Sequence, residues 1–174
     1  MRDDEAFVEF AESVRGRLRR TAYLLCGDWD QASDHVQEGL IRVYAAWPGL
    51  TRAGREHAYA RKAVVSAFLD HARRRSSTEI PAEHDRDLPS GHDVAESVAT
   101  RAALMSALAD LPPRQRACVV LRYFEDLNVA DTAAALKCSE GTVKSQTSRA
   151  LTSLRSSFNA SPTGELVTEG APSW

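Results

Sequence analysis

The 174-residue sequence has no long apolar run, and its beginning lacks a hydrophobic stretch. No segment approaches the roughly 20 consecutive apolar residues that a membrane-spanning helix needs. The first five residues, Met1 to Glu5, are polar and acidic, so we expect no secretory signal. These absences predict a cytoplasmic protein without membrane insertion.

Cysteine is scarce, with Cys26, Cys118 and Cys138 far apart along the chain. An odd, scattered set of this kind argues against a disulfide framework and against a zinc site. Each of the three cysteines falls within a helical apolar pattern. We therefore expect buried, reduced thiols and no bound metal.

Signs of catalysis are also lacking. There is no Gly-rich phosphate loop, and no nucleophile stands beside a matching base. The histidines show no metal-ligand spacing; they are His35, His57, His71, His84 and His92. We expect His35 and His71 to lie on helix surfaces. The sequence thus predicts neither an enzyme nor a cofactor.

The net charge of −2 conceals a segregation of charge along the chain. Residues 61–75 carry five basic residues and one acidic residue, and residues 114–155 carry seven basic and four acidic residues. Between them, residues 76–96 carry six acidic residues and one basic residue. A protein that merely coated DNA would have little use for an acidic strip. This segregation therefore favours a separate function for the strip over the alternative, a solvated spacer.

The acidic strip also contains the expected domain boundary. Residues 76–93 include Pro81, Pro89 and Gly91 and show no periodic apolar pattern, so they are expected to form a linker. Residues 159–174 have a similar composition and are expected to form a disordered tail.

Apolar residues recur at helical spacing on both sides of this linker. Upstream they predict three helices, over about 4–25, 30–47 and 56–75, with a turn-rich loop at 48–55. Downstream they predict helices over about 94–111 and 114–124, followed by a helix-turn-helix over 127–158. The predicted fold is all-α, with two small helical domains joined by an acidic flexible linker.

The helix-turn-helix carries the strongest functional pattern. Asn128 is placed to cap the first helix and Ser139 the second. On the second helix, the face opposite the apolar stripe carries two cations separated by short hydroxyl side chains; these residues are Lys144, Ser145, Ser148, Arg149 and Thr152. Such a face suits a helix in a DNA major groove, and the alternative is an ordinary solvated face.

Four segments together resemble the bacterial sigma factors. Residues 34–42 (DHVQEGLIR) are similar to the family pattern Asp-x-Val-Gln-Glu-x-Phe-Leu-Arg, and residues 59–75 to the helix that follows it. Residues 111–116 (LPPRQR) are similar to Leu-Pro-x-Arg-Gln-Arg, and residues 140–155 to the recognition helix. The order, spacing and two-domain size resemble the extracytoplasmic-function (ECF) group, in particular its actinobacterial sigma-E-like branch.

The resemblance implies a division of tasks. Residues 1–75 would bind core polymerase and melt the −10 promoter element, 76–93 would form the linker, 94–158 would bind the −35 element and 159–174 would be a tail. The implied partners are core RNA polymerase, through its β′ coiled-coil and β flap, and promoter DNA. Many members of the family are also held by an anti-sigma protein.

The resemblance also implies site residues on each domain. The polymerase-binding residues would be Asp34, Gln37, Glu38, Ile41 and Arg42. The −10 residues would be Arg52, Arg55, Tyr59, Arg61, Lys62, Ser66, Arg73, Arg74 and Arg75. The −35 residues would be Arg114, Ser139, Thr142, Lys144, Ser145, Ser148 and Arg149.

The sequence departs from the family pattern at four positions. Tyr59 replaces a common Trp, Ser66 a common Asn, Gly39 an apolar residue, and Lys137 a Gly in the turn. We expect Gly39 to weaken its helix by roughly 0.5–1 kcal/mol relative to Ala. We expect Lys137 to carry strain if its backbone is left-handed.

One alternative function is a stand-alone helix-turn-helix regulator with an N-terminal sensing domain. Such a regulator would bind promoter duplex without polymerase. It does not account for the match at residues 34–42 or for the arginine run at 73–75.

Overall fold

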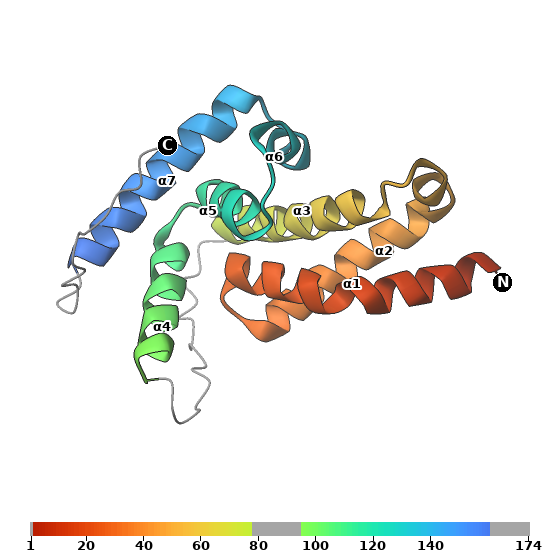
Figure 1. Ribbon diagram of the computed structural model, residues 1–174, viewed down its shortest axis with the longest axis horizontal. Coiled ribbons are helices and arrows are strands. Elements are labelled where there is room, and N and C mark those ends of the chain that lie inside the picture. The colour runs from red at the N-terminus through yellow and green to blue at the C-terminus, as the bar shows by residue number, and fades with distance from the viewer. Residues whose placement is uncertain (1, 78–94, 161–174) are drawn as a thin grey trace, which may run out of the picture.

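The computed structural model describes residues 2–77 and 95–160, and every regular element within these ranges is helical. The helices, shown in Figure 1, are α1 (Arg2–Cys26), α2 (Trp29–Ala53), α3 (Glu56–Ser77), α4 (Ala95–Asp110), α5 (Pro113–Val119), the π-helical turn η1 (Val120–Phe124), α6 (Val129–Leu136) and α7 (Glu140–Ala160). The all-α prediction is confirmed. The expected linker and tail lie almost entirely outside the described residues. Among the helices that are described, none has the length and apolar character to cross a membrane.

Helices α1, α2 and α3 pack together, and α2 contacts both of the other two. Their apolar stripes meet in one core, with Leu18, Val36, Val43, Val64 and Phe68 among its buried side chains. Asp28 begins α2, since its Oδ1 accepts the backbone N–H groups of residues 30 and 31 at 2.8 and 2.7 Å. Local capping and apolar residues at helical spacing therefore account for the formation of helices α1 to α3.

The expected loop at 48–55 was wrong, because α2 continues to Ala53 with Pro48 inside it. Two side chains near the end of α2 donate hydrogen bonds to backbone carbonyls one turn earlier in the helix. The Thr51 hydroxyl donates to the Trp47 carbonyl at 3.1 Å, and Arg52 Nε donates to the Pro48 carbonyl at 2.9 Å. The helix ends where Gly54 adopts a left-handed conformation, with φ of 60°. Tertiary anchoring of Trp47 in the core outweighs the proline penalty.

Gly39 allows α2 and α3 to approach closely. A Cβ atom at this position would lie 2.7 Å from Val64 Cγ2 and 3.1 Å from the Val64 backbone nitrogen. Real side-chain contacts do not tolerate the shorter distance. The residue that departs from the family pattern therefore has a packing reason beyond its low helix propensity.

His35 is buried between α2 and α3, so its expected place on a helix surface was wrong. Its ring meets Phe68 edge-on at 6.0 Å and His71 at 5.4 Å between ring centroids. Burial, reinforced by His71, lowers the pKa of His35. His71 is half-buried.

The helix-turn-helix forms as its sequence predicts. Asn128 Oδ1 accepts the Asp131 backbone N–H at 2.7 Å and begins α6, while Ser139 Oγ accepts the Thr142 N–H at 3.1 Å at the start of α7. Lys137 ends α6 in the left-handed conformation, with φ of 51°. Both predicted caps are confirmed, and Lys137 adopts the left-handed conformation in which strain was expected.

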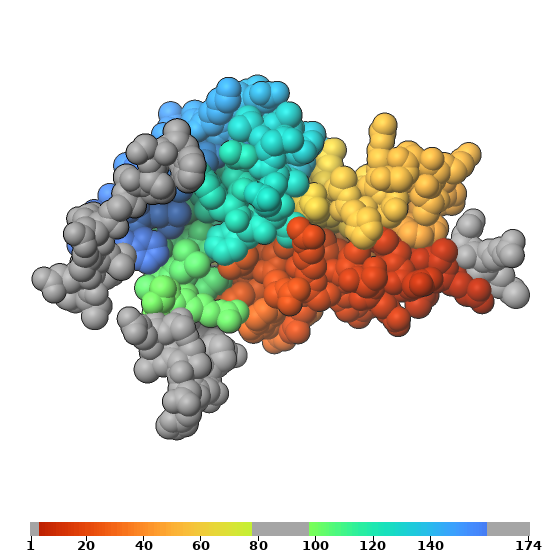
Figure 2. Space-filling view, viewed as in Figure 1, coloured from red at the N-terminus to blue at the C-terminus, as the bar shows by residue number. Residues whose placement is uncertain are grey.

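The first half of the described chain, residues 2–77, packs against the second half, residues 95–160. Helix α3 contacts α5 and α6, and α1 contacts α4, α5 and η1. Cys118, Leu121 and Leu136 from the second half join the core of the first half. Figure 2 shows the continuous surface that results.

The three cysteines are free, with Cys26 and Cys118 buried and Cys138 half-buried. Burial raises the pKa of both the Cys26 and Cys118 thiols to about 11. The expected burial therefore holds for Cys26 and Cys118 but only partly for Cys138.

Candidate nucleic-acid interface

The exposed face of α7 presents two cations above a row of short hydroxyl side chains. Lys144 and Arg149 are both exposed. Ser145 Oγ donates to the Thr142 carbonyl at 3.0 Å, and Thr152 Oγ1 donates to the Ser148 carbonyl at 3.1 Å. These hydroxyls therefore stay close to the helix, and the two long cationic side chains reach beyond them.

The two remaining residues expected at this face have structural tasks. Arg114 Nη2 donates to the Leu136 carbonyl at 3.1 Å, which satisfies an end group of α6. Ser139 caps α7, and its Oγ also lies 2.8 Å from Thr142 Oγ1. Arg114 and Ser139 thus hold the turn that orients α7, and both remain exposed.

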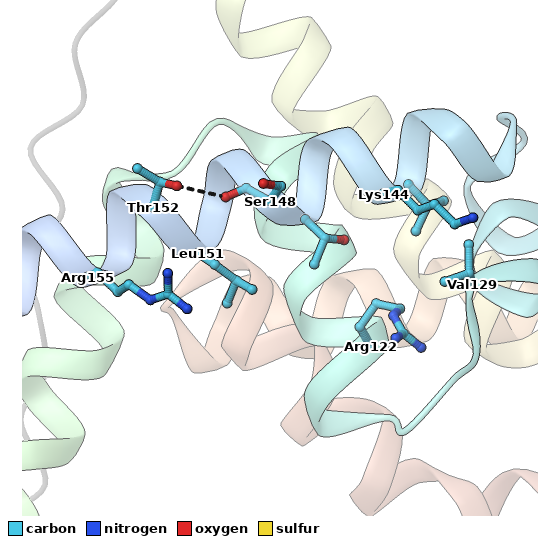
Figure 3. A pocket seen from close by; sticks show the side chains of 9 residues that line it. Arg122, Val129, Lys144, Ser148, Leu151, Thr152 and Arg155 are labelled. Carbon is cyan, nitrogen blue, oxygen red and sulfur yellow. Dashed lines mark hydrogen bonds between the residues drawn. The ribbon is translucent and has the colours of Figure 1, made fainter. Parts of the chain in front are cut away.

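A hollow of about 320 Å³ lies between α7 on one side and η1 and the start of α6 on the other. Figure 3 shows three cations around it: Arg122 from η1, and Lys144 and Arg155 from α7. Val129 and Leu151 supply apolar lining. Arg122 and Arg155 extend the basic surface beyond the residues expected from the sequence. Arg155 could have been predicted from the sequence, because it follows Lys144 by eleven residues, or about three helical turns, and so lies on the same face of the helix.

A second basic surface runs along α3 and the end of α2. Arg52 and Arg55 are exposed at the junction of the two helices, and Lys62 and Ser66 are half-buried further along α3. Tyr59 is half-buried and packs against the core. The helix ends in the arginine run, where Arg73, Arg74 and Arg75 follow one another. Arg73 Nη2 lies 3.4 Å from Asp70 Oδ1.

Arg61 differs from the other cations of α3, because a carboxylate from the second half covers it. Its Nε donates to Glu125 Oε2 at 3.0 Å, and the Glu125 side chain is only 4% exposed. Among the α3 candidates, Arg73 and Arg74 are therefore exposed, whereas the Glu125 carboxylate covers Arg61.

The expected polymerase-binding residues share one face of α2. Asp34, Gln37 and Ile41 are exposed, and the Ile41 side chain is 62% exposed. Arg42 forms an ion pair with Glu38 and a second with Asp70, whose Oδ2 lies 3.3 Å away. These pairs tie the charged edge of the face to α3.

Sequence reasoning missed an aromatic extension of this face. Tyr44 and Val8 are both more than half exposed. The Tyr44 ring packs on Phe7 at 4.9 Å between centroids, and its hydroxyl donates to Asp4 Oδ1 at 2.9 Å. The i, i+3 spacing of Ile41 and Tyr44 could have indicated a continuous patch.

The described residues contain no cluster of three or more His, Cys, Asp or Glu side chains that could hold a metal ion.

Each half of the chain matches the model of a known protein family. The model of Sigma-70 region 2 matches residues 10–78, and that of Sigma-70 region 4 matches residues 101–154. RNA polymerase sigma-E factor of Streptomyces avermitilis is 41% identical over 151 residues, which span 85% of this chain and 84% of that protein. ECF RNA polymerase sigma factor SigM of Mycobacterium tuberculosis is 31% identical over 149 residues, which span 85% of the chain and 74% of the relative. The chain belongs to the ECF RNA polymerase sigma factor family.

The fold agrees with this membership. The sigma factor RpoE from Bartonella quintana, solved in complex with the anti-sigma factor NepR, superposes with a TM-score of 0.72 at 24% identity, over 90% of this chain and 98% of that one. As an ECF sigma factor, the protein binds core RNA polymerase, recognises the −35 and −10 promoter elements and promotes transcription initiation. The sigma factor function, rather than that of a stand-alone regulator, is supported.

Proposed function

We propose that the two halves of this sigma factor divide its work between three surfaces. In this proposal, residues 1–75 form the domain that docks on polymerase and holds the −10 element, and residues 94–158 form the domain that reads the −35 element. The acidic residues 76–93 would pass through the positively charged channel by which RNA leaves. The matches to region 2 and region 4 on either side of that segment support the division.

The α2 face is the proposed polymerase-docking surface, and the exposure of Ile41 carries this assignment. A large aliphatic side chain exposed beside Asp34 and Gln37 is unfavourable in water and suits packing against another helix. The β′ coiled-coil offers such helices. Tyr44 and Val8 extend the apolar contact, while Glu38 and Arg42 supply a charged edge.

The docking assignment is tested by the double variant Asp34→Arg with Ile41→Arg. Both side chains are exposed, so the fold should be retained. A lost interface anchor costs about 2 kcal/mol or more, which corresponds to a roughly 30-fold weaker Kd for core polymerase. Glu9→Arg makes the same charge reversal at an exposed position of α1 and should bind normally. Unchanged co-purification of the double variant with polymerase would contradict the assignment.

The α3 surface is the proposed site for the opened −10 element. Melting a duplex requires cations along the backbone of the unstacked strand and side chains that hold its bases. The cations would be Arg52, Arg55, Arg61, Lys62 and Arg73 to Arg75, with Tyr59 and Ser66 beside the bases. The exposure of Arg52 and Arg55 just before α3, and of Arg73 and Arg74 near its end, supports this role.

The α7 face is the proposed −35 reader. Lys144 and Arg149 would meet phosphates or guanine edges, and Thr142, Ser145 and Ser148 would permit close approach to the groove. Arg114 and Ser139 would contribute from the turn that orients α7.

We further propose that the chain performs no chemistry of its own, since RNA synthesis belongs to the polymerase. It would act in the cytoplasm, where core polymerase and the chromosome lie. An anti-sigma protein is a candidate third partner, as many members of the family are held by one.

A further inference from the structure

The hollow beside α7 is lined by basic side chains without an acidic one. Its lining includes Arg122, Lys144 and Arg155, and no Asp or Glu is among the described residues that line it. None of these three cations forms an ion pair within the part of the chain that the structure describes. Like charges around one concave surface focus a positive potential and attract counter-ions. The hollow therefore favours an anionic ligand.

Two of the cations lie at one end of the hollow. Figure 3 shows Arg122 and Lys144 beside Val129, the first residue of α6. Arg122 is half-buried, and its Nη1 donates to the Leu127 carbonyl, which fixes the guanidinium at this end. The N-terminus of α6 adds a partial positive charge. A guanidinium, an ammonium group and a helix dipole at one place suit a phosphate group.

The other end of the hollow combines an apolar wall with a planar cation. Leu151 lines the wall, and Arg155 follows it by four residues, which places the two side chains next to each other on α7. Arg155 is exposed, so its guanidinium can move over this wall. A flat ring placed on Leu151 would be covered by the guanidinium, which stacks on aromatic faces. This end therefore suits an aromatic ring.

The size and charge of the hollow favour a single nucleotide over a DNA strand. Its volume of about 320 Å³ lies at the lower end of the range for small-ligand pockets, roughly 300–1,000 Å³. A terminal phosphate carries a charge of about −1.5 to −2 and three acceptor oxygens. Each phosphodiester of DNA carries a single negative charge. The terminal phosphate therefore balances Arg122 and Lys144 more completely.

We propose that the hollow binds a free nucleotide, with its phosphate between Arg122 and Lys144 and its base between Leu151 and Arg155. Ser148 also lines the hollow, and its exposed hydroxyl can donate to the phosphate. Lys144 and Ser148 belong to the proposed −35 face as well. A bound nucleotide therefore competes with the −35 element. This competition rests on the proposed function, whereas nucleotide binding itself does not.

Isothermal titration calorimetry of the full chain with adenosine 5′-monophosphate tests the site. Arg155→Ala should weaken binding about ten-fold, because the ring loses its cover. Arg149→Ala is the matched control, since it removes the same group from an exposed position of α7 that does not line the hollow. It should bind the nucleotide as the unmodified protein does. Absence of binding to the unmodified protein, or equal affinities of the two variants, overturns the proposal.

Two fragments of the nucleotide test the two ends of the hollow separately. Inorganic phosphate lacks the ring and adenosine lacks the phosphate, so each should bind at least about ten-fold more weakly than the whole nucleotide. Lys144→Ala should weaken binding of the nucleotide without changing that of adenosine. An affinity of either fragment that equals that of the nucleotide contradicts the two-part site.

Binding of a −35 duplex to holoenzyme provides the second readout. Adenosine 5′-monophosphate at about ten times its Kd should weaken duplex binding about ten-fold, because the two ligands exclude each other. Holoenzyme with Arg155→Ala should lose most of this sensitivity, which separates the hollow from nucleotide sites on the polymerase. A nucleotide that binds the free protein and leaves duplex binding unchanged would contradict the −35 assignment of Lys144 and Ser148 but not the nucleotide site. The two ideas can therefore fail separately.

Discussion

Lys144 and Arg149 protrude from the same face of α7, the proposed −35 reader, where their side chains would contact DNA differently. The Arg149 guanidinium is a planar fork that suits a bidentate contact to guanine, whereas the Lys144 ammonium is a point charge that suits a phosphate. Exposure alone does not separate these roles, since both residues are exposed.

We expect Arg149→Ala in holoenzyme to cost roughly 1–3 kcal/mol at one base pair of the −35 element and to relax the preference there. Lys144→Ala should weaken binding to all sequences and lower the salt slope by about 1. Binding to −35 variants across a range of salt concentrations measures both effects. Equal, sequence-blind losses from the two substitutions would instead assign the readout to DNA shape and to Ser145 and Ser148.

His35 makes the stability of the first half dependent on pH. Its pKa is lowered in the folded state from the ordinary value of 6.5, chiefly by burial. The unfolded chain therefore takes up a proton at His35 more readily than the folded one. This contribution to stability is complete above the unfolded pKa and is lost as the pH falls below it.

Urea denaturation at pH values of about 7.5 and 5.5 checks this linkage. The midpoint for unfolding should be lower at the acidic pH, and His35→Gln should reduce the difference between the two midpoints. His57→Gln is the control, because it removes an exposed histidine instead of a buried one. An unchanged pH dependence in His35→Gln would assign the acid sensitivity to other groups.

At the scale of elements, the contact between α2 and α3 depends on the missing side chain of Gly39. We expect Gly39→Ala to destabilise the protein by about 1–3 kcal/mol, because the added methyl group meets both Val64 Cγ2 and the α3 backbone. This cost should exceed the gain of about 0.5–1 kcal/mol in helix propensity. Denaturant unfolding of the full chain measures the difference.

Gly16→Ala is the matched control in α1. Apart from the adjacent residues and the backbone of α1 itself, no atom lies within 4 Å of the added Cβ, so only the helix propensity changes. Stability should rise by about 0.5–1 kcal/mol. A Gly39→Ala variant that gains stability as Gly16→Ala does would show that α2 and α3 can move apart at little cost.

For the whole molecule, the placement of the proposed DNA surfaces predicts that DNA binding depends on polymerase. The free protein should bind duplex promoter weakly, because its two surfaces are held close together. Holoenzyme should bind the same duplex tightly and open it. Electrophoretic mobility shift and permanganate footprinting, at near-physiological salt, measure binding and opening.

Tight, sequence-specific duplex binding by the free protein would contradict this prediction. It would mean that α7 and α3 present their contacts without help from polymerase, as in a stand-alone regulator. Run-off transcription with core polymerase and genomic DNA would then show whether the chain still directs initiation.

The sequence by itself determined most of the helices, the caps of α6 and α7, and which residues share the proposed DNA-reading face. These features are local: Asn128 and Ser139 cap helices within three residues, and the apolar stripes repeat every three or four residues. The cations of α7 were predictable for the same reason, since a helix fixes which of its side chains share a face.

The tertiary structure alone decided the features that join distant segments. Glu125 is separated from Arg17 by 108 positions and from Arg61 by 64, so its sequence context marks it only as one acid in a basic module. The burial of His35 and the requirement for Gly39 likewise arise from α3, a different helix. Periodicity specifies which face of a helix is apolar, but only packing decides which helix covers that face and which polar groups are enclosed with it.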